Sequence, residues 1–226
     1  MSETLSLIQS LTDLLTDKQL SELKRNISIH KYQKNELIYN EGDVPANLLC
    51  LLSGKLKVYK NGVGGRTQII RVIKPVQYLG YRAYFANQNY VTAASAFETS
   101  FVCRIPMDLV YRWMEENIHL SLFFVRQLSL DLGVSDQRTV SLTQKHIRGR
   151  LAEALLFLQE SYGLEKDGAT LSIYLTREDL ANLSNMTTSN AIRTLSAFAA
   201  EKIVAIDGRK IKIIDHEAIK KISRIG

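Results

Sequence analysis

The sequence predicts an α+β protein with an N-terminal antiparallel β-barrel, a long helix and a C-terminal winged helix-turn-helix. Short β-rich runs separated by turn residues fill the chain before residue 105. A helical pattern then runs from 107 to 143, and two capped helices followed by a hairpin lie between 176 and 214. We therefore expect an N-terminal domain over residues 1–106, a long helix over 107–144 and a C-terminal domain over 145–226.

The barrel prediction depends on the turn residues between the β-rich runs. Glycine, asparagine and serine occur at 40–43, 53–54 and 61–65, and they divide the region into segments of strand length. Strands are expected at 26–32, 48–52, 55–60, 68–73, 90–96 and 101–105. A helix is expected before them over about 4–24, and any break in it is expected near 16–17.

The long helical pattern contains a coiled-coil seam, in which side chains recur at alternating spacings of three and four. The seam comprises Val125, Leu128, Leu132, Ser135, Thr139 and Leu142. It predicts a parallel homodimer with Val125, Leu128, Leu132, Thr139 and Leu142 in the interface. The alternative is a helix packed on its own barrel, and Ser135 and Thr139 weaken the seam unless a polar group meets them.

Segment 176–187 has the layout of a short capped helix, a turn and a second cap. The Thr176 hydroxyl can cap a helix that begins at Arg177, with Asp179 placed as the N3 acid of a capping box. Asn185 tolerates the left-handed conformation that a turn requires, and Thr187 can cap the next helix. The pattern therefore predicts a helix-turn-helix.

The second helix of this pair has one apolar face, made of Ala191, Leu195, Phe198 and Ala199, and its short polar side chains point away from that face. Arg and Asn side chains suit bidentate contacts with bases in the major groove. Asp207 and Gly208 then predict a tight hairpin turn beside two cations that suit phosphate contacts. An alternative is that these elements serve packing only. The predicted DNA-contacting residues are Arg177, Thr187, Thr188, Ser189, Asn190, Arg193, Arg209 and Lys210.

The composition is that of an ordinary globular protein, with 46% hydrophobic and 23% charged residues among 226. The net charge of +6 favours a polyanionic partner only weakly, because Lys and Arg exceed Asp and Glu by three on each side of residue 145. Cys50 and Cys103 lie far apart in apolar, strand-like segments, which favours buried thiols in a reducing cytoplasm. No signal peptide or membrane-spanning stretch is visible, so we expect a cytoplasmic protein with no membrane partner.

Motifs of enzymes and metal sites are weak in this chain. The glycine turn at 62–65 lies between two strands, whereas a dinucleotide fingerprint joins a strand to a helix. His216 lacks a second histidine four residues on, the cysteines lack zinc spacing, and no nucleophile elbow is present. We therefore expect no catalytic residue, no metal site and no cofactor.

In chain order these segments resemble the Crp/Fnr family of bacterial transcription regulators over nearly the whole chain. Segment 29–60 is similar to the family's first barrel strands, with Gly42 and Gly54 at its turns, and 147–158 is similar to its hinge and first DNA-domain helix. Segment 176–195 aligns with the recognition unit without a gap. The resemblance implies a cyclic-nucleotide-binding-like jelly roll, RNA polymerase as a protein partner, and a homodimer that docks two recognition helices in successive major grooves of double-stranded DNA.

The family's two charged anchors for cyclic AMP are missing here. Members that bind cyclic AMP carry a Gly-Glu pair and, further on, an Arg before Ser or Thr and Ala. In this chain Gly80 is followed by Tyr81, and the Arg position falls on Tyr90 or Val91, ahead of Thr92. Desolvating a cyclic phosphate without its bidentate partner costs about 2 kcal/mol or more. Cyclic AMP is therefore not expected as the effector.

Two other effector chemistries occur in the family, an iron-sulfur cluster and haem. Its iron-sulfur members need four cysteines, and this chain has two. Haem ligation stays open because the chain has candidate axial histidines, although surface or packing roles are favoured for His30, His119 and His146.

Segment 78–93 takes the place of the phosphate-binding segment of cyclic-AMP-binding members, and we call it the cassette. It gathers tyrosines around one arginine, which suits a small planar or anionic ligand. Either the barrel binds such a ligand, or the tyrosines fill the space that the effector occupies in other members, and the protein is competent to bind DNA without an effector. The function indicated is a DNA-binding transcription regulator, and the competing one is a ligand-binding module that signals through protein contacts. The predicted effector-pocket residues are Tyr81, Arg82, Tyr84, Tyr90, Thr92, Ser135 and Asp136.

Overall fold

The computed structural model describes residues 2–62 and 67–225, which form two compact units. One unit contains residues 1–60 and 70–133, and the other contains 61–69 and 134–226. The division therefore falls inside the long helix, whereas the sequence placed domain boundaries at 106 and 144. Residues 63–65 of the predicted glycine turn lie outside the described residues.

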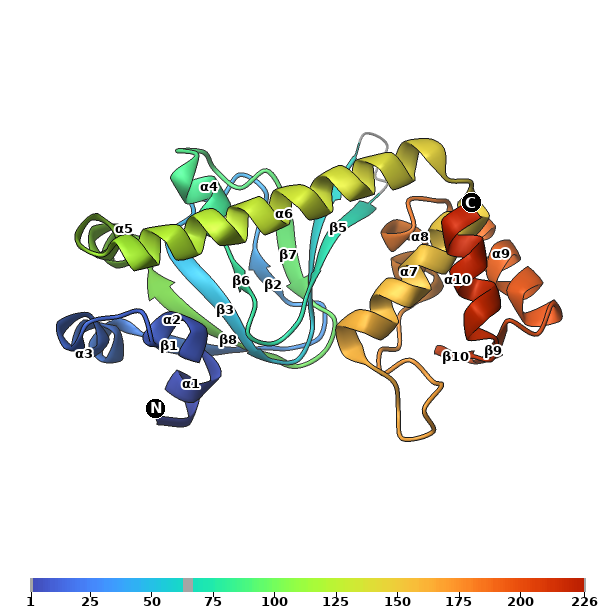
Figure 1. Cartoon of the computed structure of the whole chain (residues 1–226), viewed down its shortest axis with the longest axis horizontal. Helices are drawn as coiled ribbons and strands as arrows, with labels where there is room; N and C mark the ends of the chain where they lie inside the picture. The colour runs from blue at the N-terminus through green and yellow to red at the C-terminus, as the bar shows by residue number, and fades with distance from the viewer. Residues whose placement is uncertain (1, 63–66, 226) are drawn as a thin grey trace. The chain divides into compact units, whose positions relative to one another are not determined.

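The N-terminal unit is built on two four-stranded sheets, and the paired strands run antiparallel (Figure 1). This confirms the predicted antiparallel barrel. The two short strands β2 and β6 were not predicted, because three and two residues are too few to show a period. One sheet has the order β1 (Ser28–Tyr32), β8 (Ser100–Pro106), β3 (Asn47–Ser53), β6 (Tyr78–Leu79), and the other has the order β2 (Leu37–Tyr39), β7 (Ala93–Ala96), β4 (Leu56–Asn61), β5 (Thr67–Ile73).

Strand β3 is buried on both faces, which explains its continuous apolar run. Leu49 and Leu51 belong to the cluster inside the barrel, while Leu48, Cys50 and Leu52 belong to a second cluster between the sheet and the helices. Burying each leucine contributes about 1.5–3 kcal/mol. The two clusters therefore fix the register of β3.

The same register places Cys50 directly opposite Cys103 on β8. Both thiols are free and buried, as the sequence predicted. The two cysteines are therefore far apart in the sequence but adjacent in the sheet, because cross-strand pairing brings distant positions together.

The N-terminal helical region is broken into α1 (Ser2–Leu7), α2 (Gln9–Thr12) and α3 (Asp17–Asn26). The break predicted near 16–17 is confirmed, because Thr16 caps α3 through a complete capping box with Gln19. A further helix, α4 (Tyr81–Phe85), follows β6 and was not predicted.

The helical pattern predicted over 107–143 forms two helices, α5 (Met107–Glu116) and α6 (Ile118–Gln144). The prediction of one continuous helix was therefore wrong. Asn117 has an extended backbone and donates from its side chain to the Leu14 carbonyl oxygen at 2.7 Å. The first part of α6 lies along the barrel in Figure 1, where Leu120 and Phe124 join the outer cluster.

The C-terminal unit contains α7 (Ile147–Tyr162), α8 (Arg177–Leu183), α9 (Thr188–Ala200), the hairpin β9 (Val204–Asp207) and β10 (Lys210–Ile213), and α10 (His216–Ile225). A side-chain contact of 3.1 Å between Gln159 and His216 joins α7 to α10. Within the described part of the chain, no helix is long and apolar enough to cross a membrane.

Candidate functional site

The helix-turn-helix forms through the capping contacts that the sequence predicted. The Thr176 hydroxyl accepts a hydrogen bond from the Asp179 backbone N–H at 3.0 Å, and Thr187 accepts one from the Asn190 N–H at 3.2 Å. Asn185 adopts a left-handed conformation with φ of 49°. The predicted order of helix, turn and helix is thus confirmed between α8 and α9.

Arg150 on α7 braces this turn, a role that the sequence analysis missed. Its Nε donates to the Ser184 carbonyl oxygen and its Nη2 to that of Asn185, each at 3.2 Å, while Nη1 donates to Lys145 at 3.1 Å. The Ser184 and Asn185 carbonyls lie at the end of α8, where a helix leaves acceptors unsatisfied, and the Lys145 carbonyl lies just before α7. Arg150 therefore stabilises both the turn and the start of α7.

Helix α9 buries the apolar face that the sequence predicted, with Ala191, Leu195 and Phe198 buried and Ala199 partly buried. The opposite face is exposed and contains Thr188, Ser189, Ile192, Arg193 and Ser196, while Asn190 is partly buried. Ile192 was missed because a single apolar residue does not disturb the predicted pattern. Its side chain is 47% exposed beside Arg193.

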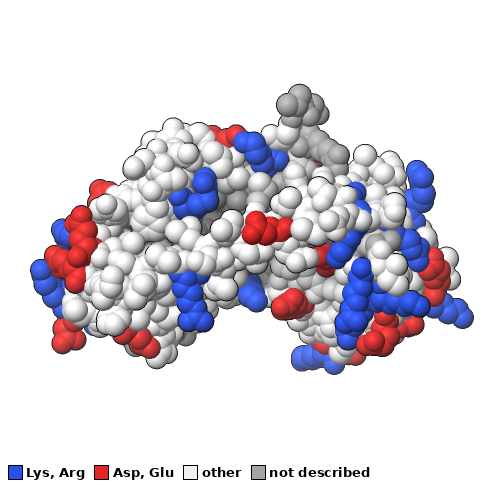
Figure 2. Space-filling view, turned by 45° about the horizontal axis from the view of Figure 1, so that its top comes forward, with Lys and Arg blue, Asp and Glu red and all other residues white. Residues whose placement is uncertain are grey.

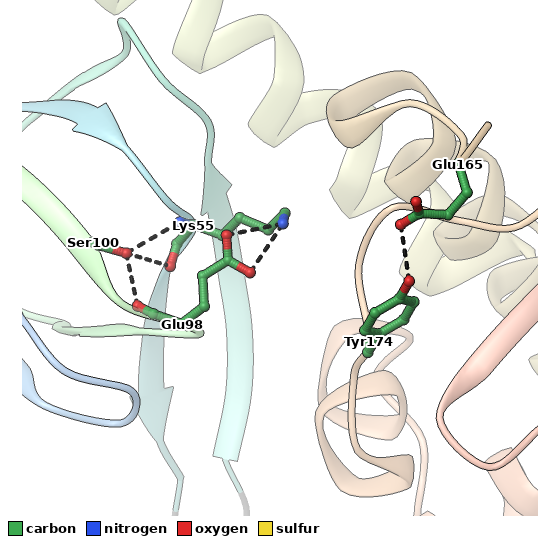
Figure 3. A network of polar contacts seen from close by, with 5 residues as sticks. All are labelled: Lys55, Glu98, Ser100, Glu165 and Tyr174. Carbon is green, nitrogen blue, oxygen red and sulfur yellow. Dashed lines mark hydrogen bonds and ion pairs between the residues drawn. The ribbon is translucent and has the colours of Figure 1, made fainter.

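The hairpin after α9 forms the predicted wing. Gly208 takes a left-handed φ of 56° at its tip, and Arg209 and Lys210 are exposed beside it. The Lys210 ammonium lies 5.9 Å from the centre of the Tyr174 ring. Tyr174 in turn donates to a Glu165 carboxylate oxygen at 2.9 Å, as Figure 3 shows.

Arg177, predicted to hold a phosphate, is partly engaged inside the protein. Its Nη2 donates to the Gly208 carbonyl oxygen at 2.7 Å and thereby ties the start of α8 to the wing. Its Nη1 is buried without a hydrogen-bond partner among the described residues. The surface view in Figure 2 shows basic and acidic side chains interspersed on the visible face, in line with the evenly divided net charge.

In the N-terminal unit, Asp131 makes a polar contact between α6 and the barrel. Its Oδ2 accepts hydrogen bonds from the Tyr81 hydroxyl and from Arg71 Nη1, both at 2.8 Å. We call Arg71, Tyr81 and Asp131 the Asp131 cluster. Burial and the negative charge of Asp131 both raise the pKa of Tyr81, so its hydroxyl stays a donor. Neither Asp131 nor Arg71 was predicted; an acid on an otherwise apolar helix face is the signal that was available.

The other predicted effector residues occupy different neighbourhoods. Tyr90 is buried and stacks on Tyr39 with ring centres 3.8 Å apart. Tyr84 donates to Asp108 on α5 at 3.0 Å. Burial raises the pKa of Tyr39, and the nearby Thr92 side chain acts in the opposite direction. Arg82 is exposed on α4, and Ser135 and Asp136 are exposed on α6.

A separate polar network shapes the β3–β4 turn of the barrel (Figure 3). Gly54 has a φ of 93°, and a Cβ there would lie 2.3 Å from the Ser100 hydroxyl, so only glycine fits. The Lys55 N–H donates to that hydroxyl at 3.1 Å, and Lys55 Nζ pairs with Glu98 at 2.9 Å.

Comparison with known proteins gives matches to both units. A family model described as a cyclic nucleotide-binding domain matches residues 29–117, and one described as a Crp-like helix-turn-helix domain matches 149–222. The chain belongs to the Crp/Fnr family of transcription regulators.

Relatives of this Crp/Fnr-family chain cover most of its length. It is 26% identical over 211 residues to an anaerobic regulatory protein of Pasteurella multocida, covering 92% of this chain and 77% of the relative. It is 21% identical over 206 residues to a CRP-like cAMP-activated global transcriptional regulator of Mycobacterium tuberculosis, covering 91% and 92%. The structure of FixK2 from Bradyrhizobium japonicum superposes with a TM-score of 0.78 at 19% identity, covering 87% and 96%.

Helix α6 of this Crp/Fnr-family chain exposes an apolar stripe to solvent. Ile118, Leu122, Val125 and Leu132 are all more than half exposed, and they lie on one face of the helix. Of the other predicted seam residues, Thr139 is exposed and Leu142 is partly buried, while Leu128 packs against the outer core cluster of its own chain. The exposed stripe thus shares Val125 and Leu132 with the predicted seam and begins seven residues, or about two turns, earlier.

Proposed function

We propose that this chain is a homodimeric transcription regulator that reads double-stranded DNA with α9 and the wing and does not respond to cyclic AMP. The exposed face of α9 carries the proposal. That face presents short polar side chains and one free arginine on a helix whose first turn is capped and whose preceding turn is braced by Arg150. Such a rigid presentation suits direct readout of base edges.

The side chains of this surface suit two kinds of contact. Arg193 is exposed in the first half of α9, so it is assigned a base, and Thr188 and Ser189 flank it. Arg209 and Lys210 are assigned to phosphates because they extend from the tip of the wing. Arg177 is assigned to orienting the wing as well as to a phosphate, since it already donates to Gly208.

Dimerisation is proposed through the exposed stripe of α6. A stripe of Ile118, Leu122, Val125 and Leu132 in water is unfavourable for a monomer, and a parallel pair of helices would bury it. Two recognition helices would then reach two half-sites one helical turn apart, so a palindromic operator is expected.

The absence of cyclic AMP sensitivity is proposed from the residues that replace the family's anchors. Tyr81 donates to Asp131, and Tyr90 stacks on Tyr39, so neither position offers a charge to a cyclic phosphate. An effector of different chemistry would act by biasing the link between α6 and α7, at Lys145 and His146, between two placements of the DNA domains. RNA polymerase as protein partner and a cytoplasmic location belong to the same proposal.

A second reading follows from the same aromatic residues. Tyr81 and Tyr90 are both buried, so the tyrosines themselves can occupy the space of an effector. The chain would then bind DNA without any small molecule.

Selection of bound sites from random duplexes tests the function, followed by titration of the best site at several salt concentrations. We expect a palindrome and an affinity that falls steeply with salt. Arg193→Ala should cost about 1–3 kcal/mol on the selected site and relax its specificity, whereas Lys210→Ala should weaken all duplexes alike. Failure to select any sequence, or equal loss on selected and random DNA for Arg193→Ala, would favour a module that acts through protein contacts.

A further inference from the structure

Arg104 on β8 directs its side chain toward the inside of the barrel. Val102, two residues before it, belongs to the inner core cluster, while Cys103 and Ile105 belong to the outer one. The cross-strand neighbour of Arg104 on β3 is Leu49, which is also an inner residue. The alternation along β8 therefore puts a guanidinium on the inner wall.

This guanidinium is incompletely satisfied. Its Nη2 donates to the Tyr32 hydroxyl in a short contact, and its centre lies 5.7 Å from the Tyr32 ring. Its Nε is buried and has no hydrogen-bond partner among the described residues. No carboxylate in the described ranges 2–62 and 67–225 forms an ion pair with it. A buried N–H of a charged group that has no acceptor is unfavourable, so the unpaired Nε of Arg104 requires an explanation.

The aromatic residues nearest to Arg104 are Tyr32 and Tyr90, and the Asp43 carboxylate also acts on Tyr90 without forming an ion pair with Arg104 among the described residues. Burial raises the pKa of Tyr90 and the positive charge of Arg104 acts in the opposite direction, so the two groups are within electrostatic reach. Gly80 lets Tyr90 approach the wall, because a Cβ there would lie 3.0 Å from the Tyr90 hydroxyl. Tyr90 stacks on Tyr39 at 3.8 Å, which makes a flat aromatic surface on the same side.

Two exposed side chains share the inner face with Arg104. Strand β1 forms the edge of its sheet, and Ser28 and His30 on it lie in register with Arg104 and Val102. Cross-strand partners share a face, and both β1 side chains are exposed. This exposed edge strand is the side from which a small molecule would approach the guanidinium.

We propose that Arg104 anchors a small planar carboxylate inside the barrel, with the stacked Tyr39 and Tyr90 as its apolar wall. Nε and Nη2 form adjacent donors that match a carboxylate, and one negative charge balances the Arg104 guanidinium, whereas the Arg71 guanidinium is already paired with Asp131. The cation that holds the ligand thus comes from β8 and not from the cassette. This inference rests on the proposed regulator function and names the chemical class of its effector.

Calorimetry on the full-length protein without DNA tests the proposal, with benzoate as the probe and uncharged benzamide as its matched control, in chloride-free buffer. Benzoate should bind once per chain, and benzamide should bind at least tenfold more weakly. Arg104→Met should weaken benzoate at least tenfold, while Lys31→Met, which removes an exposed cation on the outer face of β1, should change it less than twofold.

Two further variants separate ligand binding from a brace between β8 and β1. Arg104→Lys keeps the charge but loses the paired donors, so benzoate should weaken at least fivefold even if Arg104→Met does not fold. Tyr32→Phe frees Nη2, so benzoate binding should be retained. No benzoate binding to wild type, equal binding of benzamide, or unchanged affinity in both Arg104 variants would overturn the proposal. DNA binding measured on the same samples keeps the two questions apart, because its loss would instead refute the regulator function.

Discussion

Ile192 stands out on the recognition helix at the scale of single residues. It is 47% exposed on a surface whose other members are polar or charged, and it lies beside Arg193. An apolar side chain in the major groove suits contact with the methyl group of thymine. We therefore expect an apolar contact with the base beside the polar readout that the sequence predicted.

We predict that Ile192→Ala weakens binding to the selected site by about 1 kcal/mol, roughly the contribution of one or two buried methylenes. Replacing the contacted thymine with uracil, which lacks only the methyl group, should weaken the wild-type protein similarly and leave Ile192→Ala unaffected. Fluorescence anisotropy with both duplexes measures the four affinities. If the losses in binding free energy from Ile192→Ala and from the uracil substitution were additive, Ile192 would not contact the thymine methyl group.

The cysteine pair makes a second prediction at this scale. Burial raises the pKa of Cys103 to about 12, and burial followed by the nearby Cys103 raises that of Cys50 as well. At pH 8 the Cys103 thiolate is then roughly one part in ten thousand of the total thiol. We expect iodoacetamide to label neither cysteine in the folded protein over minutes and both in urea, as read by mass spectrometry. Rapid labelling in the folded state would show that the strands open.

The same shifts give the thiols a pH-dependent effect on stability. Their folded pKa values lie above the unfolded value, so the folded state keeps its protons longer than the unfolded state does. The stabilisation is fully present below about pH 9 and is lost as the pH rises from there toward about 12 for Cys103. A double Cys50→Ala, Cys103→Ala variant should show a shallower loss of stability in that range.

At the scale of secondary-structure elements, the Asp131 cluster attaches α6 to β5 and α4. It joins β5, α4 and α6 through one carboxylate oxygen, and both charged side chains are about two-thirds buried. A hydrogen bond to a charged group contributes about 1.5–3 kcal/mol. The cluster therefore docks the first part of α6 on the barrel without any ligand.

We predict that Asp131→Ala lowers the free energy of unfolding of the N-terminal unit by about 2 kcal/mol, and Tyr81→Phe by about 1 kcal/mol. The double variant should lose less than the sum, because the two groups contact each other. Trp113, the single tryptophan and a buried residue of α5, reports this unit by fluorescence during urea denaturation. Asp136→Ala, an exposed acid on the same helix, serves as the control and should change little.

At the scale of the whole molecule, the apolar stripe of α6 is proposed to control dimer assembly. Leu132 is 62% exposed in a single chain, whereas Leu128, one turn earlier, packs against the core of its own chain. These two leucines therefore separate assembly from folding.

We predict that Leu132→Ala shifts the protein toward monomer at low concentration and weakens operator binding, while the free energy of unfolding of the monomer itself changes little. Leu128→Ala should instead lower the free energy of unfolding by about 1–2 kcal/mol, less than for a fully buried leucine, because Leu128 is only partly buried. Sedimentation over a dilution series, with urea denaturation alongside, distinguishes the two. A wild-type monomer at all concentrations, or a Leu132→Ala dimer as tight as wild type, would exclude the stripe from assembly.

Much of this protein was determined by local sequence alone. Thr176, Thr187 and Asn185 form their caps and turn with residues at most three positions away, so a pattern in the sequence is enough to find them. Periodicity likewise predicted the longer strands, the helix pair and the wing, because each element must bury one face.

Only the tertiary structure decided which distant residues meet. The Asp131 cluster joins residues up to 60 positions apart, and Arg150 reaches a carbonyl 35 positions away. The pairing of Cys50 with Cys103 depends on the register of two strands, and the break at Asn117 depends on the carbonyl of Leu14. Such contacts have no period in the sequence, since they follow from how sheets and helices pack and not from neighbouring residues. The inward direction of Arg104 became visible for the same reason, once the two core clusters had shown which face of β8 is the inner one.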